Sequence, residues 1–113
     1  MTILYEAISL QDLQKLLGNH YNDMIKAVAD IRKGVLAIDA ELHSDLESLL
    51  VEKGSSGEDL WGFNIYPLED GENFIEYDSL INIRPGQDNR SRNVEDEGKR
   101  RLIEEIVRKL IAK

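Results

Sequence analysis

The stretch that decides the fold runs from residue 24 to residue 47 and reads MIKAVADIRKGVLAIDAELHSDLE. Two patterns compete in its first two thirds. Apolar side chains recur at alternating spacings of four and three residues, which is typical of an amphipathic helix. Apolar and polar residues also alternate as in a half-buried strand, and Lys33-Gly34 stands where a hairpin turn would lie.

The end of this stretch favours the hairpin. Ser44-x-x-Glu47 has the form of a capping box, in which the two side chains bind free N–H groups at the start of a helix. A helix that starts at this point is not the continuation of an earlier one. We therefore predict strands at 25–32 and 35–40, followed by a helix at 45–52.

Strands and helices alternate on either side of this hairpin. Residues 2–8 are expected to form a short strand, and Ser9 can cap the helix that follows it. Residues 60–66 and 74–84 each alternate apolar and polar side chains, which predicts an antiparallel pair of strands with one face in water. A last amphipathic helix is expected at 96–112.

These elements predict one α+β domain spanning residues 1–113, in the order β-α-β-β-α-β-β-α. Hairpin-connected strands with interspersed helices favour a two-layer architecture, in which a mostly antiparallel or mixed sheet carries the helices on one face. The predicted core consists of Leu13, Leu16, Ile31, Ile38, Leu49, Trp61, Phe63, Ile65, Ile81, Ile83, Ile103, Ile106, Val107 and Leu110. The last helix is also expected to bury Leu102 and Ile111.

Composition excludes several classes of function. The net charge is −8, with −11 on residues 1–83 and +3 on residues 84–113, so the acidic body argues against binding to duplex nucleic acid. The sequence has no cysteine, which excludes thiol chemistry and cysteine-ligated metal centres and agrees with a reducing cytoplasm. No leader-like segment and no apolar run of about 20 residues is present, so we expect a cytoplasmic protein without a membrane partner.

The loop RPGQDNRSR, residues 84–92, is the first candidate site. Its three guanidinium groups and several amides could recognise a phosphate, a carboxylate or an acidic protein partner. The alternative is that the arginines pair with acidic side chains of the same chain, which we expect for Arg92. The predicted ligand-binding set is Asn64, Asn82, Arg84, Asn89 and Arg90.

A second candidate site is Glu41-x-His43-x-Asp45. On a strand these three side chains would share a face and could hold a divalent metal. The alternative is a solvated strand end followed by acidic residues in the first turn of a helix, where the helix dipole favours them. No nucleotide or cofactor fingerprint is present, so no cofactor is predicted.

Four stretches of the sequence carry a resemblance to a known family. They are AIxxELH at 37–43, LWGFNIYP at 60–67, DSLINIRP at 78–85 and NRS at 89–91. The chain resembles a family of small uncharacterised prokaryotic proteins, a domain of unknown function, over nearly its whole length. Members often carry Gly-Gly where this chain has Asp39-Ala40, and Gly where it has Asp88. These departures argue against a special backbone geometry at those positions.

The resemblance implies a stand-alone prokaryotic protein and supplies no activity. Our preferred interpretation is a non-enzymatic binding or interaction module, with a homo-oligomer as one form, that recognises a small anion or a protein partner. The rival is a small metal-dependent hydrolase or nucleotide-processing enzyme that uses the 41–45 set. A third interpretation is a regulatory partner of a neighbouring gene product.

Overall fold

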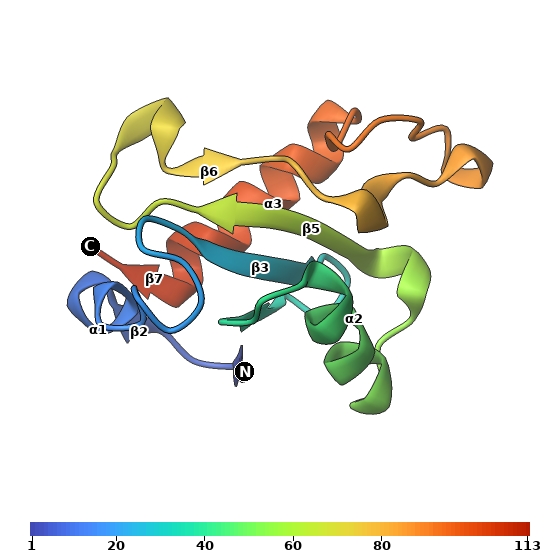
Figure 1. Ribbon diagram of the computed structural model, residues 1–113. Helices are drawn as coiled ribbons and strands as arrows, with labels where there is room; N and C mark the ends of the chain where they lie inside the picture. The colour runs from blue at the N-terminus through green and yellow to red at the C-terminus, as the bar shows by residue number, and fades with distance from the viewer.

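A five-stranded sheet forms the middle of the molecule in the computed structural model, which describes residues 1–113 (Figure 1). Its strand order is β1-β4-β3-β5-β6, and every neighbouring pair is antiparallel. The strands are β1 Thr2–Leu4, β3 Ile25–Asp30, β4 Val35–Ile38, β5 Leu60–Ile65 and β6 Ile75–Glu76. The two long strands, β3 and β5, pair along their full length and form the centre of the sheet.

Three α-helices and a small second sheet complete the domain. None of the helices is long and apolar enough to cross a membrane. The predicted order of elements is confirmed, except that the first strand is divided and a short last strand is added. The helices are α1 Leu10–Gln14, α2 His43–Glu52 and α3 Glu97–Leu110, and the parallel strands of the second sheet are β2 Ile8–Ser9 and β7 Ile111–Ala112.

The helices lie on both faces of the sheet, not on one face as predicted. α3 crosses behind the sheet and α2 lies in front of it (Figure 1). Ala27 and Phe63 belong to the larger core, which includes the apolar side of α3. Val28 and Leu60 belong to a second core together with Leu46 and other residues of α2. The second face is covered because β3 and β4 carry small apolar residues on both sides.

The hairpin at residues 25–38 is confirmed, and Asp30 explains much of its turn. The carboxylate of Asp30 accepts hydrogen bonds from the backbone N–H groups of Arg32 and Lys33, each at 2.9 Å. It also accepts one from the Ser55 hydroxyl at 2.6 Å, which ties the segment after α2 to the turn. Gly34 has a φ of 71°, a conformation that favours glycine.

A new helix does follow the hairpin, but the predicted capping box is wrong. α2 begins at His43, and its N-cap is Leu42, which makes no side-chain cap hydrogen bond. The chain therefore turns into the helix two residues earlier than the Ser44 cap would require. Glu47 is free of a capping role, and its carboxylate binds Arg84 instead.

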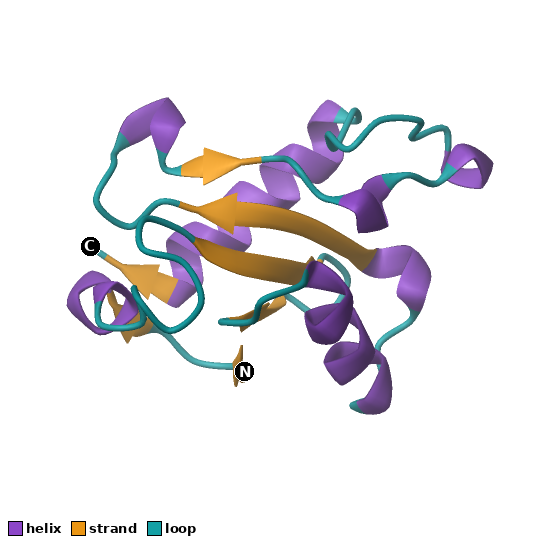
Figure 2. Cartoon of the chain, viewed as in Figure 1, coloured by secondary structure: helices purple, strands orange, loops and turns teal.

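The predicted strand at 74–84 is wrong beyond Glu76. The chain forms a short 3-10 turn at Leu80–Asn82, one of several such turns in Figure 2. Ile83 consequently projects outward and is 44% exposed. Leu102 of α3 is 42% exposed, also against prediction. Of the other predicted core residues, Leu16, Ile31, Leu49 and Ile81 are half-buried and the rest are buried.

Two aspartates adopt the left-handed backbone conformation. Asp39 has a φ of 73° and Asp88 a φ of 57°. The expectation of ordinary backbone geometry at these two positions is therefore wrong. Aspartate tolerates this region better than most residues because its short polar side chain can bond locally. The Asp39 carboxylate also accepts a hydrogen bond from Asn19, twenty residues away in the sequence, at 3.1 Å.

Candidate functional site

The side chain of Asn82 takes the place of a neighbouring strand beside β5. Its Oδ1 accepts a hydrogen bond from the Gly62 N–H at 2.8 Å. Its Nδ2 donates to the Gly62 carbonyl at 2.9 Å and to the Arg92 carbonyl at 3.0 Å. Asn82 is fully buried, so this predicted ligand-binding residue joins the loop to the sheet.

Glycine is the only residue type that fits at position 62, beside this contact. A Cβ atom at position 62 would lie 2.6 Å from the Ser79 Oγ and 2.7 Å from the Ser79 Cβ. Ser79 is itself held in place, because its N–H donates to the Arg92 carbonyl at 3.0 Å. The glycine of LWGFNIYP therefore allows the 78–92 segment to approach β5 closely.

Asn89 organises the inside of the predicted loop. Its Nδ2 donates to the carbonyls of Asn82, Ser91 and Asn93, at distances of 2.7 to 3.1 Å. Its Oδ1 accepts from the Glu95 N–H at 2.8 Å. Both polar atoms of this buried amide are thus bound by backbone groups.

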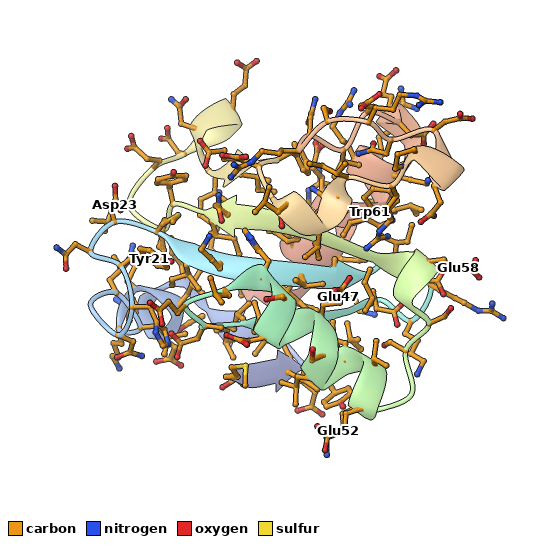
Figure 3. All side chains as sticks on the ribbon, turned by 45° about the vertical axis from the view of Figure 1, so that its right-hand side comes forward. Tyr21, Asp23, Glu47, Glu52, Glu58 and Trp61 are labelled. Atoms are coloured by element: carbon orange, nitrogen blue, oxygen red, sulfur yellow. The ribbon has the colours of Figure 1, made fainter.

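Arg84 also points inward rather than toward a ligand. Its Nη2 donates to the Leu60 carbonyl at 2.5 Å and lies 3.3 Å from the Glu47 carboxylate. Its guanidinium lies 4.6 Å from the centre of the Trp61 ring, and Figure 3 shows Trp61 beside the loop and Glu47 on α2. Burial lowers the pKa of Arg84, and the nearby Glu47 opposes that shift.

The other two arginines of the loop differ from each other. Arg92 pairs with Asp78 at 2.5 Å, as predicted. Arg90 is exposed and its guanidinium forms no ion pair. Its backbone N–H donates to the Glu95 carboxylate at 2.8 Å. Hydrogen bonds from the Ser91 hydroxyl and from the N–H groups of residues 90 and 91 lower the pKa of Glu95.

Asn64 lies away from the loop, in a polar row that crosses three strands. Lys26 of β3, Asn64 of β5 and Glu76 of β6 stand opposite one another. The Asn64 Nδ2 donates to the Glu76 carboxylate at 2.9 Å, and the Tyr66 hydroxyl donates to the same oxygen at 3.0 Å. Burial and this hydrogen bond to Glu76 raise the pKa of Tyr66 to about 12.

The predicted metal set of Glu41, His43 and Asp45 is not formed. The prediction placed the three residues on one strand face, but His43 is the first residue of α2. Its Nε2 lies 2.8 Å from the Phe63 carbonyl, while Glu41 and Asp45 are exposed. No three His, Cys, Asp or Glu side chains gather anywhere in the chain as metal ligands would.

His43 should make the stability of the fold depend on pH. Burial lowers its pKa from 6.5 to about 4, against the opposing effect of the Phe63 carbonyl. The neutral ring is therefore favoured in the fold, and stability is full above the unfolded pKa and falls as the pH drops below about 6.5. Between pH 7 and 4.5 we expect this group to cost about 2–3 kcal/mol of the free energy of unfolding.

Urea denaturation at several pH values measures this loss. In His43→Gln the side-chain amide can still donate to Phe63 but does not titrate, so the additional loss below pH 6.5 should disappear. Equal pH dependence in the two proteins would contradict the assignment.

A cavity of about 720 Å³ lies elsewhere, between β6 and α3. Its α3 wall is a helical stripe with spacings of four, three and one residues, and Ile111 of β7 continues it. Val107 and Ile111 were predicted from the sequence as core residues, and no site was predicted here. The residues that line the cavity are Gly71, Glu72, Phe74, Ile75, Tyr77, Asn93, Arg100, Glu104, Val107, Arg108, Ile111 and Lys113.

The polar groups in the middle of this groove bind one another. The Tyr77 hydroxyl donates to the Glu104 carboxylate at 3.0 Å, and burial together with that bond raises the pKa of Tyr77. Arg100 donates to the carbonyls of Val94 and Glu95 at 2.6 and 3.0 Å. These three side chains form a fixed polar wall.

Two cations of the groove remain free. Arg108 and Lys113 form no ion pair within the chain. The Lys113 ammonium lies 4.0 Å from the centre of the Phe74 ring, at the apolar floor of the groove. The chain has a net charge of −8, yet these two cationic side chains lie without an ionic partner beside the apolar floor of the groove.

Comparison with known proteins identifies the family. The family described as "Protein of unknown function (DUF5674)" matches residues 2–110. The chain belongs to the DUF5674 family. No curated protein and no solved structure matches the chain.

DUF5674 membership agrees with the resemblance stated from the sequence, and the function of the family is unknown. Within this DUF5674 chain, the residues that carry the resemblance are largely architectural. Gly62, Asn82 and Asn89 join the loop to β5, and Arg84 packs on Trp61. The groove is built from different residues, mainly of β6 and α3.

Proposed function

We propose that the protein is a non-catalytic binding module that holds an amphipathic anion in the groove between β6 and α3. The observation that carries the proposal is a cavity of about 720 Å³ whose apolar floor is flanked by the unpaired cations Arg108 and Lys113. Cavities of about 300–1,000 Å³ with apolar walls and a few placed polar groups are typical of small-ligand sites.

The chemistry of the lining defines the ligand. Phe74, Ile75 and Val107 suit an apolar body, because burying apolar surface is favourable. A carboxylate or phosphate at one end would receive charge-assisted hydrogen bonds from Arg108 and Lys113. Tyr77, Glu104 and Arg100 already form hydrogen bonds within the chain, so this site supports binding better than proton transfer.

The proposal keeps the anionic ligand class inferred from the sequence and moves its site. Of the 84–92 set, Arg90 alone has a free guanidinium, so a contact of this loop with an acidic partner would depend mainly on Arg90. We propose a cytoplasmic location as well, supported by the absence of cysteine.

Fluorescence titration with anilinonaphthalene sulfonate, an amphipathic anion, tests the site directly. We expect saturable binding of one probe per chain, displaced by octanoate and more weakly by octanol, which has the same apolar body without the charge. An Arg108→Gln/Lys113→Gln variant should lose about five- to tenfold in octanoate affinity, because exposed charge pairs contribute about 1 kcal/mol. Its octanol affinity should be unchanged.

The matched control is Arg101→Gln/Lys109→Gln, which removes two positive charges from α3 outside the groove. We expect its affinity for octanoate to stay within about twofold of the original. An equal loss in both variants would show that net charge, not the groove, governs binding. Absence of saturable probe binding would refute the proposed function.

A further inference from the structure

We infer that the natural occupant of the groove is an extended acidic segment of another polypeptide, which pairs with the free edge of β6. This inference rests on the proposed function, because it names the class of anion that the groove receives. It uses an additional observation, the unpaired main chain of Tyr77.

The register of β5 and β6 shows which groups are free. The Tyr66 N–H donates to the Phe74 carbonyl at 2.9 Å, and Ile65 stands opposite Ile75. In an antiparallel pair the bonded and non-bonded residue pairs alternate. The main-chain groups of Ile75 therefore point away from β5, and those of Tyr77 follow on the same side.

Tyr77 confirms that this edge is open. Neither its backbone N–H nor its carbonyl forms a hydrogen bond within the chain. An open strand edge beside a pocket is the arrangement used in recognition by strand addition, where main-chain bonds provide affinity and pockets select alternate side chains.

The protein's own chain already covers the next position of this edge. Ser79 lies two residues beyond Tyr77, on the same side, and its N–H donates to the Arg92 carbonyl at 3.0 Å. The following residue, Asn93, lines the groove. The edge is thus closed at Ser79 by the 92–93 segment and open from Ile75 to Tyr77. A guest strand would therefore pair with Ile75 and Tyr77, in line with the 92–93 segment.

The groove selects the side chains of such a guest. An apolar side chain that faces the groove would contact Phe74, Val107 and Ile111. A carboxylate two residues along the guest, on the same face, would reach Arg108 or Lys113, which form no ion pair in the chain. The lining holds three cationic side chains, Arg100, Arg108 and Lys113, against the two carboxylates of Glu72 and Glu104. Charge complementarity therefore favours a segment whose groove-facing side chains are apolar and acidic over one with basic side chains.

The test uses the five-residue peptide Glu-Thr-Val-Thr-Glu, acetylated and amidated at its ends, in which the two glutamates and the valine share one face of an extended strand. We expect it to displace anilinonaphthalene sulfonate from the groove, and a peptide with lysine in place of glutamate to bind at least about tenfold more weakly. The Arg108→Gln/Lys113→Gln variant should reduce this preference, whereas Arg101→Gln/Lys109→Gln should keep it.

Two N-methylated forms of the peptide test the pairing with β6. In an extended strand, alternate N–H groups point to opposite edges. Methylation of the set that faces β6 should weaken binding at least about tenfold, while methylation of the other set should leave affinity within about threefold. An equal effect of the two methylations, in either direction, would overturn strand addition.

The two proposals fail separately. If the probe and octanoate bind but the acidic peptide does not displace them, the groove is a small-molecule site and the peptide inference is wrong. If neither the probe nor octanoate binds, the proposed function itself is wrong. Size-exclusion chromatography at rising protein concentration tests whether the guest is a second copy of this chain. Dimers that form with rising concentration and dissociate when the peptide is added would show that the guest is that copy and would overturn the inference of an external segment.

Discussion

The Asn82→Asp variant is expected to lose about 3–5 kcal/mol of its free energy of unfolding. The substitution keeps the size of the side chain but replaces its Nδ2 by an oxygen. That oxygen would face the carbonyls of Gly62 and Arg92, to which Asn82 now donates at 2.9 and 3.0 Å. A fully buried charge would thus lie against two acceptors. Urea denaturation at pH 7 measures the loss.

The same change at Asn22 is the matched control. Asn22 is exposed and its side chain makes no hydrogen bond within the chain, so Asn22→Asp should cost less than about 0.5 kcal/mol. The penalty at position 82 should also shrink on acidification, relative to the unsubstituted protein, because a protonated aspartate can donate one hydrogen bond. A loss at position 82 as small as at position 22 would contradict the strand-like role of this amide.

Gly62→Ala should cost about 2–3 kcal/mol, because the added methyl group would lie 2.7 Å from the Ser79 Cβ and 2.6 Å from its Oγ. Rotation of the serine side chain moves Oγ but leaves Cβ in place, so the backbone of one segment must shift. The change in the free energy of unfolding, measured in urea, gives the size of this effect.

A double-mutant cycle identifies the cause of that loss. Ser79→Gly removes the two nearest atoms that the new methyl group would meet and leaves only the Ile81 Cγ1 at 3.1 Å, so Gly62→Ala should cost markedly less in that background than alone. We expect a coupling energy of at least about 1 kcal/mol between the two sites. Additive effects would mean that the glycine serves backbone conformation rather than the close approach of the two segments.

Local signals were sufficient to predict the order of the elements. The turn at Lys33-Gly34 and the start of a new helix shortly after it decided between a hairpin and a helix, and both lie within a few residues of the elements that they define. The apolar faces of β5 and, apart from Leu102, of α3 were likewise predicted correctly, because alternation and helical periodicity are properties of a single segment. The presence of a helix on the second face of the sheet could not be predicted, since it depends on where α2 packs.

The candidate site was harder to predict, because polar residues serve two purposes that look alike in a sequence. Asn82 and Asn89 were expected to bind a ligand, yet irregular backbone needs the same amide groups to satisfy its own buried carbonyls. The partner of Asn82 is Gly62, twenty residues away, which no local pattern indicates. The groove was missed for a related reason, since its walls come from β6 and the C-terminal half of α3.

The outer edge of β5 has a consequence for molecules in a crowded solution. Along this edge the Leu60 carbonyl is bound by Arg84, Gly62 by Asn82, and Asn64 stands opposite Glu76 of β6. Strand edges with free main-chain groups are the places where separate chains join into aggregates. The side chains of Asn82 and Arg84 therefore protect the β5 edge from pairing with other molecules of the protein. A substitution at Asn82 or Arg84 would expose a template for precipitation, so its first visible effect would be a lower solubility limit.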